Sequence, residues 1–150
     1  MATQFVPLRE IACGIVERIK SGAGNRFKLV TYAQATNGEQ VWELLQAMSS
    51  IPGCIVTIGS GEFGPDTLTR TVRVMVIVVN KFSRGTAAAA DGIWQQVESV
   101  MNLFLPGEQT VCPEVCGIVF MPVTWQPLES EESVCAYSLV LEGTEFLTKE

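Results

Sequence analysis

The chain has 150 residues, of which 47% are apolar and 17% are charged, and its net charge is −6 at pH 7. This length suits one domain, residues 1–150, with a single core, and the low charge is a weak sign of surface covered by partner subunits. The acidic balance argues against a protein that grips nucleic-acid phosphates over a broad basic face, but it allows one that surrounds DNA without gripping it.

The first part of the chain predicts two helices and a short strand. A helix is expected from Leu8 to Ser21, where apolar residues recur at steps of three and four, and a second from Glu39 to Ser49. Between them Phe27 to Ala33 alternates enough to suggest a strand. The stretch before the first helix, MATQFVP, lacks the basic start and apolar run of a secretory signal. No run approaches the roughly 18 apolar residues that span a bilayer, so we expect the chain to be made in the cytoplasm.

The middle of the chain predicts two strands and the strongest helix. Cys54 to Ile58 is an apolar, β-branched strand, and Thr69 to Asn80 is a longer one. The second alternates at first and then becomes wholly apolar, which indicates a strand that leaves solvent and enters the sheet centre, buried on both faces. Thr86 to Leu105 carries a helical apolar stripe. Trp94 lies beside that stripe and Trp42 beside the stripe of the preceding helix, so we expect both to be core residues.

The last part of the chain predicts a hairpin. Gly117 to Trp125 and Val134 to Leu141 are the expected strands, joined by the acidic segment QPLESEES. The tail GTEFLTKE is polar with one apolar dipeptide. The element order predicts a single α+β domain with an antiparallel or mixed four- to five-stranded sheet and helices packed mainly on one face.

The stretch IVTIGSGEFG contains G-x-G-x-x-G at Gly59, Gly61 and Gly64. A dinucleotide site needs a helix that begins inside this motif, because the helix N-terminus receives the pyrophosphate. Here Pro65-Asp66 and then the long apolar strand follow. We therefore expect a hairpin loop from Gly59 to Thr67 and no bound cofactor.

The chain also lacks the usual signs of catalysis and of metal binding. It has no histidine, so no Ser-His or Cys-His pair can form, and we predict no catalytic residues. We expect the carboxylates Asp91 and Glu98 to lie on a solvated helix face. The number of cysteines is odd, which indicates reduced thiols that pack as small apolar groups. They are Cys13, Cys54, Cys112, Cys116 and Cys135. Cys112 and Cys116 resemble half a metal site without a second half, so no metal is expected.

Several polar and aromatic residues are candidates for contacts with partners. The basic residues around the long strand form either a solvated edge or a positive patch for an acidic neighbouring subunit, and the acidic loop either is solvated or docks a basic surface. Trp125 is a candidate anchor at an interface rim. The candidate interface residues are Gly61, Glu62, Phe63, Arg70, Arg73, Lys81, Arg84, Trp125, Glu129, Glu131 and Glu132.

From about Leu8 to Gly143 the chain resembles a known family. The resemblance lies in an N-terminal helix, followed in order by VWELLQAMSSIPGCIVTIGSG, TRTVRVMVIVVNKFSRG, AAAADGIWQQVESVMNLFLPG and CGIVFMPVTWQPLESEESVCAYSLVLEG. This order is similar to that of the small tail-terminator or tail-completion proteins of tailed bacteriophages, including the Mu-like prophage tail protein group. It rests on pattern and element order, not on a catalytic motif.

The resemblance implies a virion protein that assembles into a ring, commonly a hexamer, at the head-proximal end of the tail tube. Such a ring stops tube polymerisation, contacts the tube protein and the neck or connector, and in contractile tails the sheath. DNA passes through the central hole without sequence-specific binding, and no reaction is catalysed. Three other interpretations stay open. They are another virion subunit such as a neck connector or baseplate protein, a small enzyme or nucleotide-binding module using Gly59 to Gly64, and an adaptor without a viral role.

Overall fold

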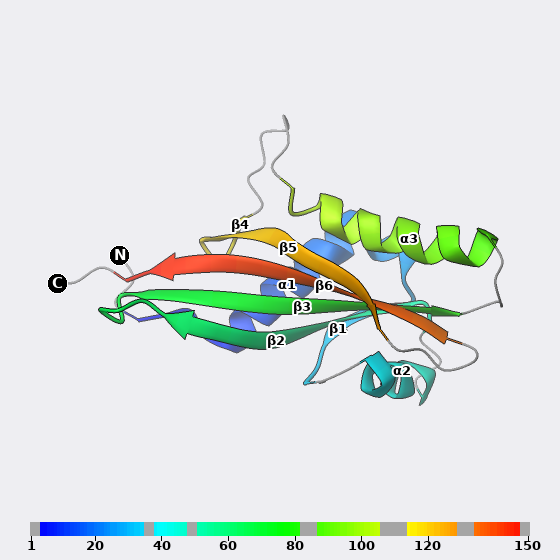
Figure 1. The fold of residues 1–150 in the computed structure, drawn as a ribbon, viewed down its shortest axis with the longest axis horizontal. Coiled ribbons are helices and arrows are strands. Elements are labelled where there is room, and N and C mark those ends of the chain that lie inside the picture. Colours follow the sequence, from blue (N-terminus) through cyan, green and yellow to red (C-terminus); the bar gives the residue numbers. More distant parts are fainter. Residues whose placement is uncertain are drawn as a thin grey trace.

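The computed structural model describes residues 4–34, 38–47, 51–81, 87–105, 114–128 and 134–147. These residues form three α-helices, one 3-10 turn and six strands (Figure 1). In chain order they are α1 (Leu8–Ala23), η1 (Gly24–Arg26), β1 (Leu29–Tyr32), α2 (Gly38–Ala47), β2 (Gly53–Phe63), β3 (Thr69–Lys81), α3 (Ala87–Asn102), β4 (Glu114–Val115), β5 (Ile118–Leu128) and β6 (Val134–Phe146). No described helix is long and apolar enough to cross a bilayer.

The strands form one mixed sheet in the order β1-β2-β3-β6-β5-β4. β1 and β2 are parallel and are connected through α2, whereas the other neighbouring strands are antiparallel. The predicted α+β class and mixed sheet are therefore confirmed. The predicted strand number of four to five is too low, because β4 is a two-residue strand and two residues carry no periodic signal.

Each face of the sheet carries its own apolar cluster, and helices cover the two faces to different extents. On the face that we call the first, α1 and α3 pack against alternate strand residues such as Val74 and Val76 of β3. On the second face, α2 packs through Val41 and Leu45. Figure 1 shows α2 on the opposite side of the sheet from α3, near one end of the strands. The rest of the second face is uncovered by any described helix.

The long strand β3 explains this two-sided arrangement. Its residues Val76 to Val79 are all buried, the even-numbered ones in the first cluster and the odd-numbered ones in the second. Its first half alternates instead, because only the first face is covered there. The prediction of a strand that enters the sheet centre is confirmed, with Lys81 as its last residue instead of Asn80.

The β2–β3 hairpin is longer than the sequence indicated. A loop was expected from Gly59, but β2 continues to Phe63, with an irregularity in register between Ile58 and Gly61. A Cβ atom on Gly61 would lie 2.4 Å from the backbone oxygen of Thr71, so glycine allows the close approach of the two strands. The turn itself occupies only the residues from Gly64 to Leu68, which lie between the two strands.

The end of the chain also differs from the prediction. The last strand was expected to end at Leu141, but β6 runs to Phe146 and pairs with β3 as far as Thr69. At the same end of the molecule lie the turn between β2 and β3, the described residues before α1 and the end of β6 (Figure 1). This end projects away from α2 and α3, and we call it the hairpin end.

Candidate functional site

At the hairpin end a buried ion pair ties the first described residues to the sheet. An Arg70 Nη2 atom lies 2.8 Å from Glu145 Oε1, and the two side chains are only 15% and 7% exposed. Arg70 also donates to the carbonyl oxygen of Val6 at 2.7 Å, while the Val6 N–H donates to Glu145 Oε2 at 2.8 Å. The Arg70 guanidinium lies 4.7 Å from the centre of the Phe5 ring. Arg70 is thus committed to contacts within the chain.

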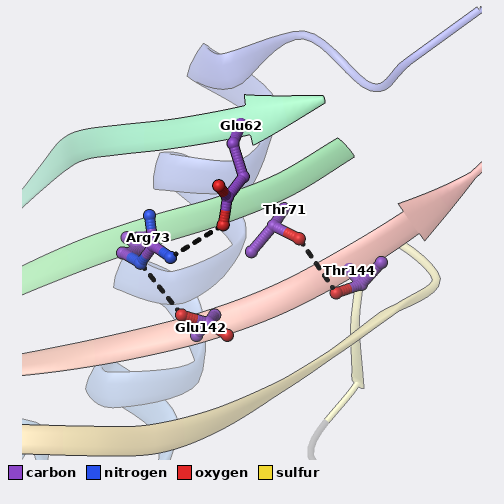
Figure 2. Close-up of polar contacts among 5 residues, drawn as sticks. All are labelled: Glu62, Thr71, Arg73, Glu142 and Thr144. Atoms are coloured by element: carbon purple, nitrogen blue, oxygen red, sulfur yellow. Dashed lines mark hydrogen bonds and ion pairs between the residues drawn. The ribbon is translucent and has the colours of Figure 1, made fainter. Parts of the chain in front are cut away.

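Arg73 forms a second polar cluster on the opposite, uncovered face (Figure 2). Its Nε donates to Glu142 Oε2 at 2.9 Å and its Nη2 to Glu62 Oε1 at 3.1 Å. Beside it the hydroxyls of Thr71 and Thr144 lie 3.3 Å apart. The hydrogen bonds to Glu62 and then to Glu142 raise the pKa of Arg73. This cluster is partly exposed, and its one arginine and two carboxylates leave a net charge of −1.

These contacts correct the idea of a positive patch along the long strand. Arg70 and Arg73 are three residues apart on a strand, so they point to opposite faces, and each is paired with a carboxylate. Lys81 is exposed at the far end of β3. Arg84 lies outside the described residues, as do Glu129, Glu131 and Glu132 of the acidic loop and Cys112.

An aromatic cleft lies between α3 and the strands β5 and β6. It has a volume of about 380 Å³ and is lined by Trp94, Val97, Glu98, Met101, Trp125 and Tyr137. Trp94 donates its indole N–H to the Tyr137 hydroxyl at 3.0 Å. Trp94 and Trp125 are 49% and 60% exposed. We call this site the aromatic cleft.

The prediction that Trp94 is a core residue is wrong. The buried line of α3 consists of Ile93, Val97 and Val100, and Phe104, just after the helix, continues it. Trp94 follows Ile93 by one residue, which turns its side chain about 100° around the helix and towards β6. Trp125 is exposed, which is compatible with its expected position at a rim. The side chain of Trp42 lies outside the described part of the structure.

The glycine-rich strand lines a smaller groove at the hairpin end. The groove has a volume of about 210 Å³ and includes Gly59, Gly61, Phe63 and Leu8. Phe63 is exposed, and its ring centre lies 5.9 Å from that of Phe5. A strand follows the motif, as predicted, so the glycines lack the helix N-terminus of a dinucleotide site.

The described residues offer little for metal or thiol chemistry. Within the described ranges no group of three or more Cys, Asp or Glu side chains is placed to hold a metal ion. Cys54 is fully buried, and burial raises the pKa of its thiol. Burial also raises the pKa of Cys116 and of Cys135. Raised thiol pKa values disfavour the reactive thiolate, which is compatible with packed, reduced cysteines.

Comparison with known protein families found no family model that matches the chain, and comparison with curated protein sequences found no significant match.

Proposed function

We propose that the chain is a structural virion protein that forms a ring at the head-proximal end of a phage tail tube. The ring ends tube polymerisation and joins the tail to the neck. The observation that supports the ring most directly is the open sheet, with β1 at one end of the strand order and β5, with its two-residue neighbour β4, at the other. A contact between two different surfaces repeated from copy to copy closes into a ring when the rotation allows it.

Exposed apolar side chains along β5 support a protein interface. Val119, Met121, Val123 and Trp125 are all exposed on this strand. β4 pairs only with Ile118 and Val119, so among the described residues the rest of β5 has a free edge. Val119 and Met121 lie on the uncovered face, whereas Trp125, beyond the register shift between Pro122 and Thr124, lies on the α3 face. Exposed apolar groups on both sides of such a strand mark a contact surface.

The prolines of β5 indicate that this contact is made by side chains. Pro122 and Pro127 lack the N–H that strand addition requires, and proline on an edge strand disfavours pairing with another strand. The proposed neighbours in the particle are the other copies in a ring of commonly six, the tail tube protein, the neck or connector protein and, in contractile tails, the sheath. The hairpin end, which projects from the body in Figure 1, is our candidate for contact with the tube or neck.

The acidic charge suits a channel for DNA. With a net charge of −6 the wall of such a ring would not retain phosphates as DNA passes. A neck connector or a baseplate subunit would share these features, so position in the particle separates the alternatives. For the nucleotide-binding alternative, the test is thermal stabilisation by added nucleotide.

Labelling of intact particles tests the proposal. Antibodies raised against the purified protein are bound to particles and located by gold labelling in the electron microscope. We expect label at the junction of tail and neck of these particles, at the head-proximal end of the tail. Label at the baseplate, or along the whole tube, would refute the terminator role and would assign the chain to that part of the particle.

A further inference from the structure

The aromatic cleft is a preformed site on the surface of the molecule. The hydrogen bond between Trp94 and Tyr137 fixes two of its rings across the gap between α3 and β6. Trp125 closes the site from β5, and Glu98 stands exposed at its border. A volume of about 380 Å³ is near the low end for ligand sites and suits one or two side chains.

The chemistry of this cleft favours a cation. The faces of tryptophan and tyrosine rings attract ammonium and guanidinium groups, and the attraction is strongest over tryptophan. The Glu98 carboxylate adds a negative charge beside the rings. Tryptophan, tyrosine and arginine are also the residues that most often dominate protein interfaces.

Most basic side chains of the described chain are already engaged. Arg70 and Arg73 are paired with carboxylates, Lys20 with Glu17, Arg9 donates to Tyr32, and Arg18 donates to a backbone oxygen. Among the described residues, the side chains of Arg26, Lys28 and Lys81 have neither an ion pair nor a hydrogen bond. Arg26 and Lys28 are exposed and directly precede β1.

The positions of the two surfaces match a head-to-tail contact. The carbonyl oxygen of Arg26 accepts a hydrogen bond from Gln96 of α3 at 3.2 Å, so the cationic segment lies beside the helix that supplies Trp94 and Glu98 to the cleft. Gln96 follows Trp94 by two residues, about 200° around the helix, so the cations and the cleft lie on different sides of α3. A contact between copies through them therefore joins two different patches. This is the heterologous type of interface from which rings are built.

We propose that the aromatic cleft of one copy binds the Arg26–Lys28 segment of the next copy, with the cationic side chains over the rings of Trp94 and Trp125 and beside Glu98. This inference rests on the proposed ring and names its interface. A stable interface buries roughly 800 Å² per partner, whereas one aromatic side chain buries about 150–250 Å². The cleft is therefore the centre of the proposed interface, and surfaces around it supply the remaining area.

The test is the self-association of purified full-length variants. Association is measured by sedimentation over a dilution series, with folding checked by circular dichroism and thermal unfolding. Trp125→Ala is expected to weaken association at least tenfold, as is the double variant Arg26→Glu/Lys28→Glu. Glu98→Lys is expected to do the same, and combining Glu98→Lys with Arg26→Glu/Lys28→Glu is expected to restore association.

Two matched controls accompany these variants. Lys81→Glu reverses another exposed, unpaired lysine, and Glu43→Lys reverses an exposed carboxylate on α2. Both are expected to associate as the unmodified chain does. If rings form and the cleft and Arg26–Lys28 variants leave them unchanged, the interface assignment is overturned while the ring stands. If the unmodified chain stays monomeric at every concentration, the ring and its interface are both overturned. If rings form and depend on the cleft, but the label in particles lies away from the neck, the interface assignment stands and the terminator role is refuted.

Discussion

Replacing Glu145 by glutamine is expected to destabilise the fold by about 3 kcal/mol. Breaking a buried ion pair usually costs about 3–5 kcal/mol, because the remaining charge stays buried without its partner. Arg70 would keep its bond to the Val6 carbonyl and its position over Phe5, and its side chain is still 15% exposed. These contacts place the cost at the lower end of that range. The Arg70 Nε atom already lacks a hydrogen-bond partner, so little compensation is available within the chain.

Glu142→Gln is the matched control. It lies on the same strand and also pairs with an arginine, but Glu142 and Arg73 are each 35% exposed. Arg73 keeps its bond to Glu62 in this variant. Exposed pairs contribute less than about 1 kcal/mol, so the control is expected to change stability by no more than this.

Urea unfolding at pH 7 measures both variants. Protein concentration is held constant, because self-association contributes to apparent stability. The m-values are expected to stay the same while the midpoint falls for Glu145→Gln. Added salt is expected to shrink mainly the small effect of Glu142→Gln, since exposed charges are screened much more than buried ones. A Glu145→Gln variant within about 0.5 kcal/mol of the unmodified chain, or equal to Glu142→Gln, would refute the reasoning.

Three further predictions concern packing and thiols. Gly143→Ala is expected to cost about 1–3 kcal/mol in urea unfolding, because its Cβ would lie 2.7 Å from Ile118 and 2.9 Å from Phe120; an unchanged midpoint would disprove this. Since burial raises the pKa of Cys54, the unfolded chain loses its thiol proton first as pH rises above about 8.5. The free energy of unfolding of the unmodified chain should then fall, relative to that of Cys54→Ala, by up to about 1.4 kcal/mol per pH unit. Parallel plots of unfolding free energy against pH for the two proteins would contradict this. Burial also raises the pKa of Cys116, so iodoacetamide at pH 7.5 is expected to modify it more slowly than glutathione; a faster rate would count against the structure.

The elements that the sequence predicts best are those whose packing is periodic. α1 begins at Leu8 as expected, because its buried residues Ile11, Ile15 and Ile19 follow the helical repeat. β3 is predicted for a related reason: its apolar pattern changes where the second face becomes covered. In both cases the apolar pattern that predicts the element lies within the element's own residues.

The elements that the sequence misses depend on partners far along the chain. The second half of β2 contains glycines and exposed residues, and it is a strand because β3 supplies its hydrogen bonds. The end of β6 likewise pairs with the start of β3. Burial of Glu145 follows from Arg70, which is 75 residues away, and no local pattern announces such a pair.

The aromatic cleft was only partly predictable. Trp125 was a candidate contact from the sequence because it ends a predicted strand beside an acidic turn. Trp94 was assigned to the core because it borders the apolar stripe of its helix. Its exposure depends on where β6 places Tyr137, which the helix sequence alone does not contain. The polar cluster at Arg73 was hidden for the same reason, since its carboxylates come from two other strands.

The most direct test of the proposed function is to delete the gene in the element that encodes it and to image the lysate by electron microscopy. The account predicts complete heads beside unjoined tails of irregular or excess length, and restoration of joined particles when the gene is supplied on a plasmid. Normal particles after deletion would contradict a terminator role outright. Heads without any tails, or joined tails that lack a tip, would also contradict it and would assign the protein to another part of the particle.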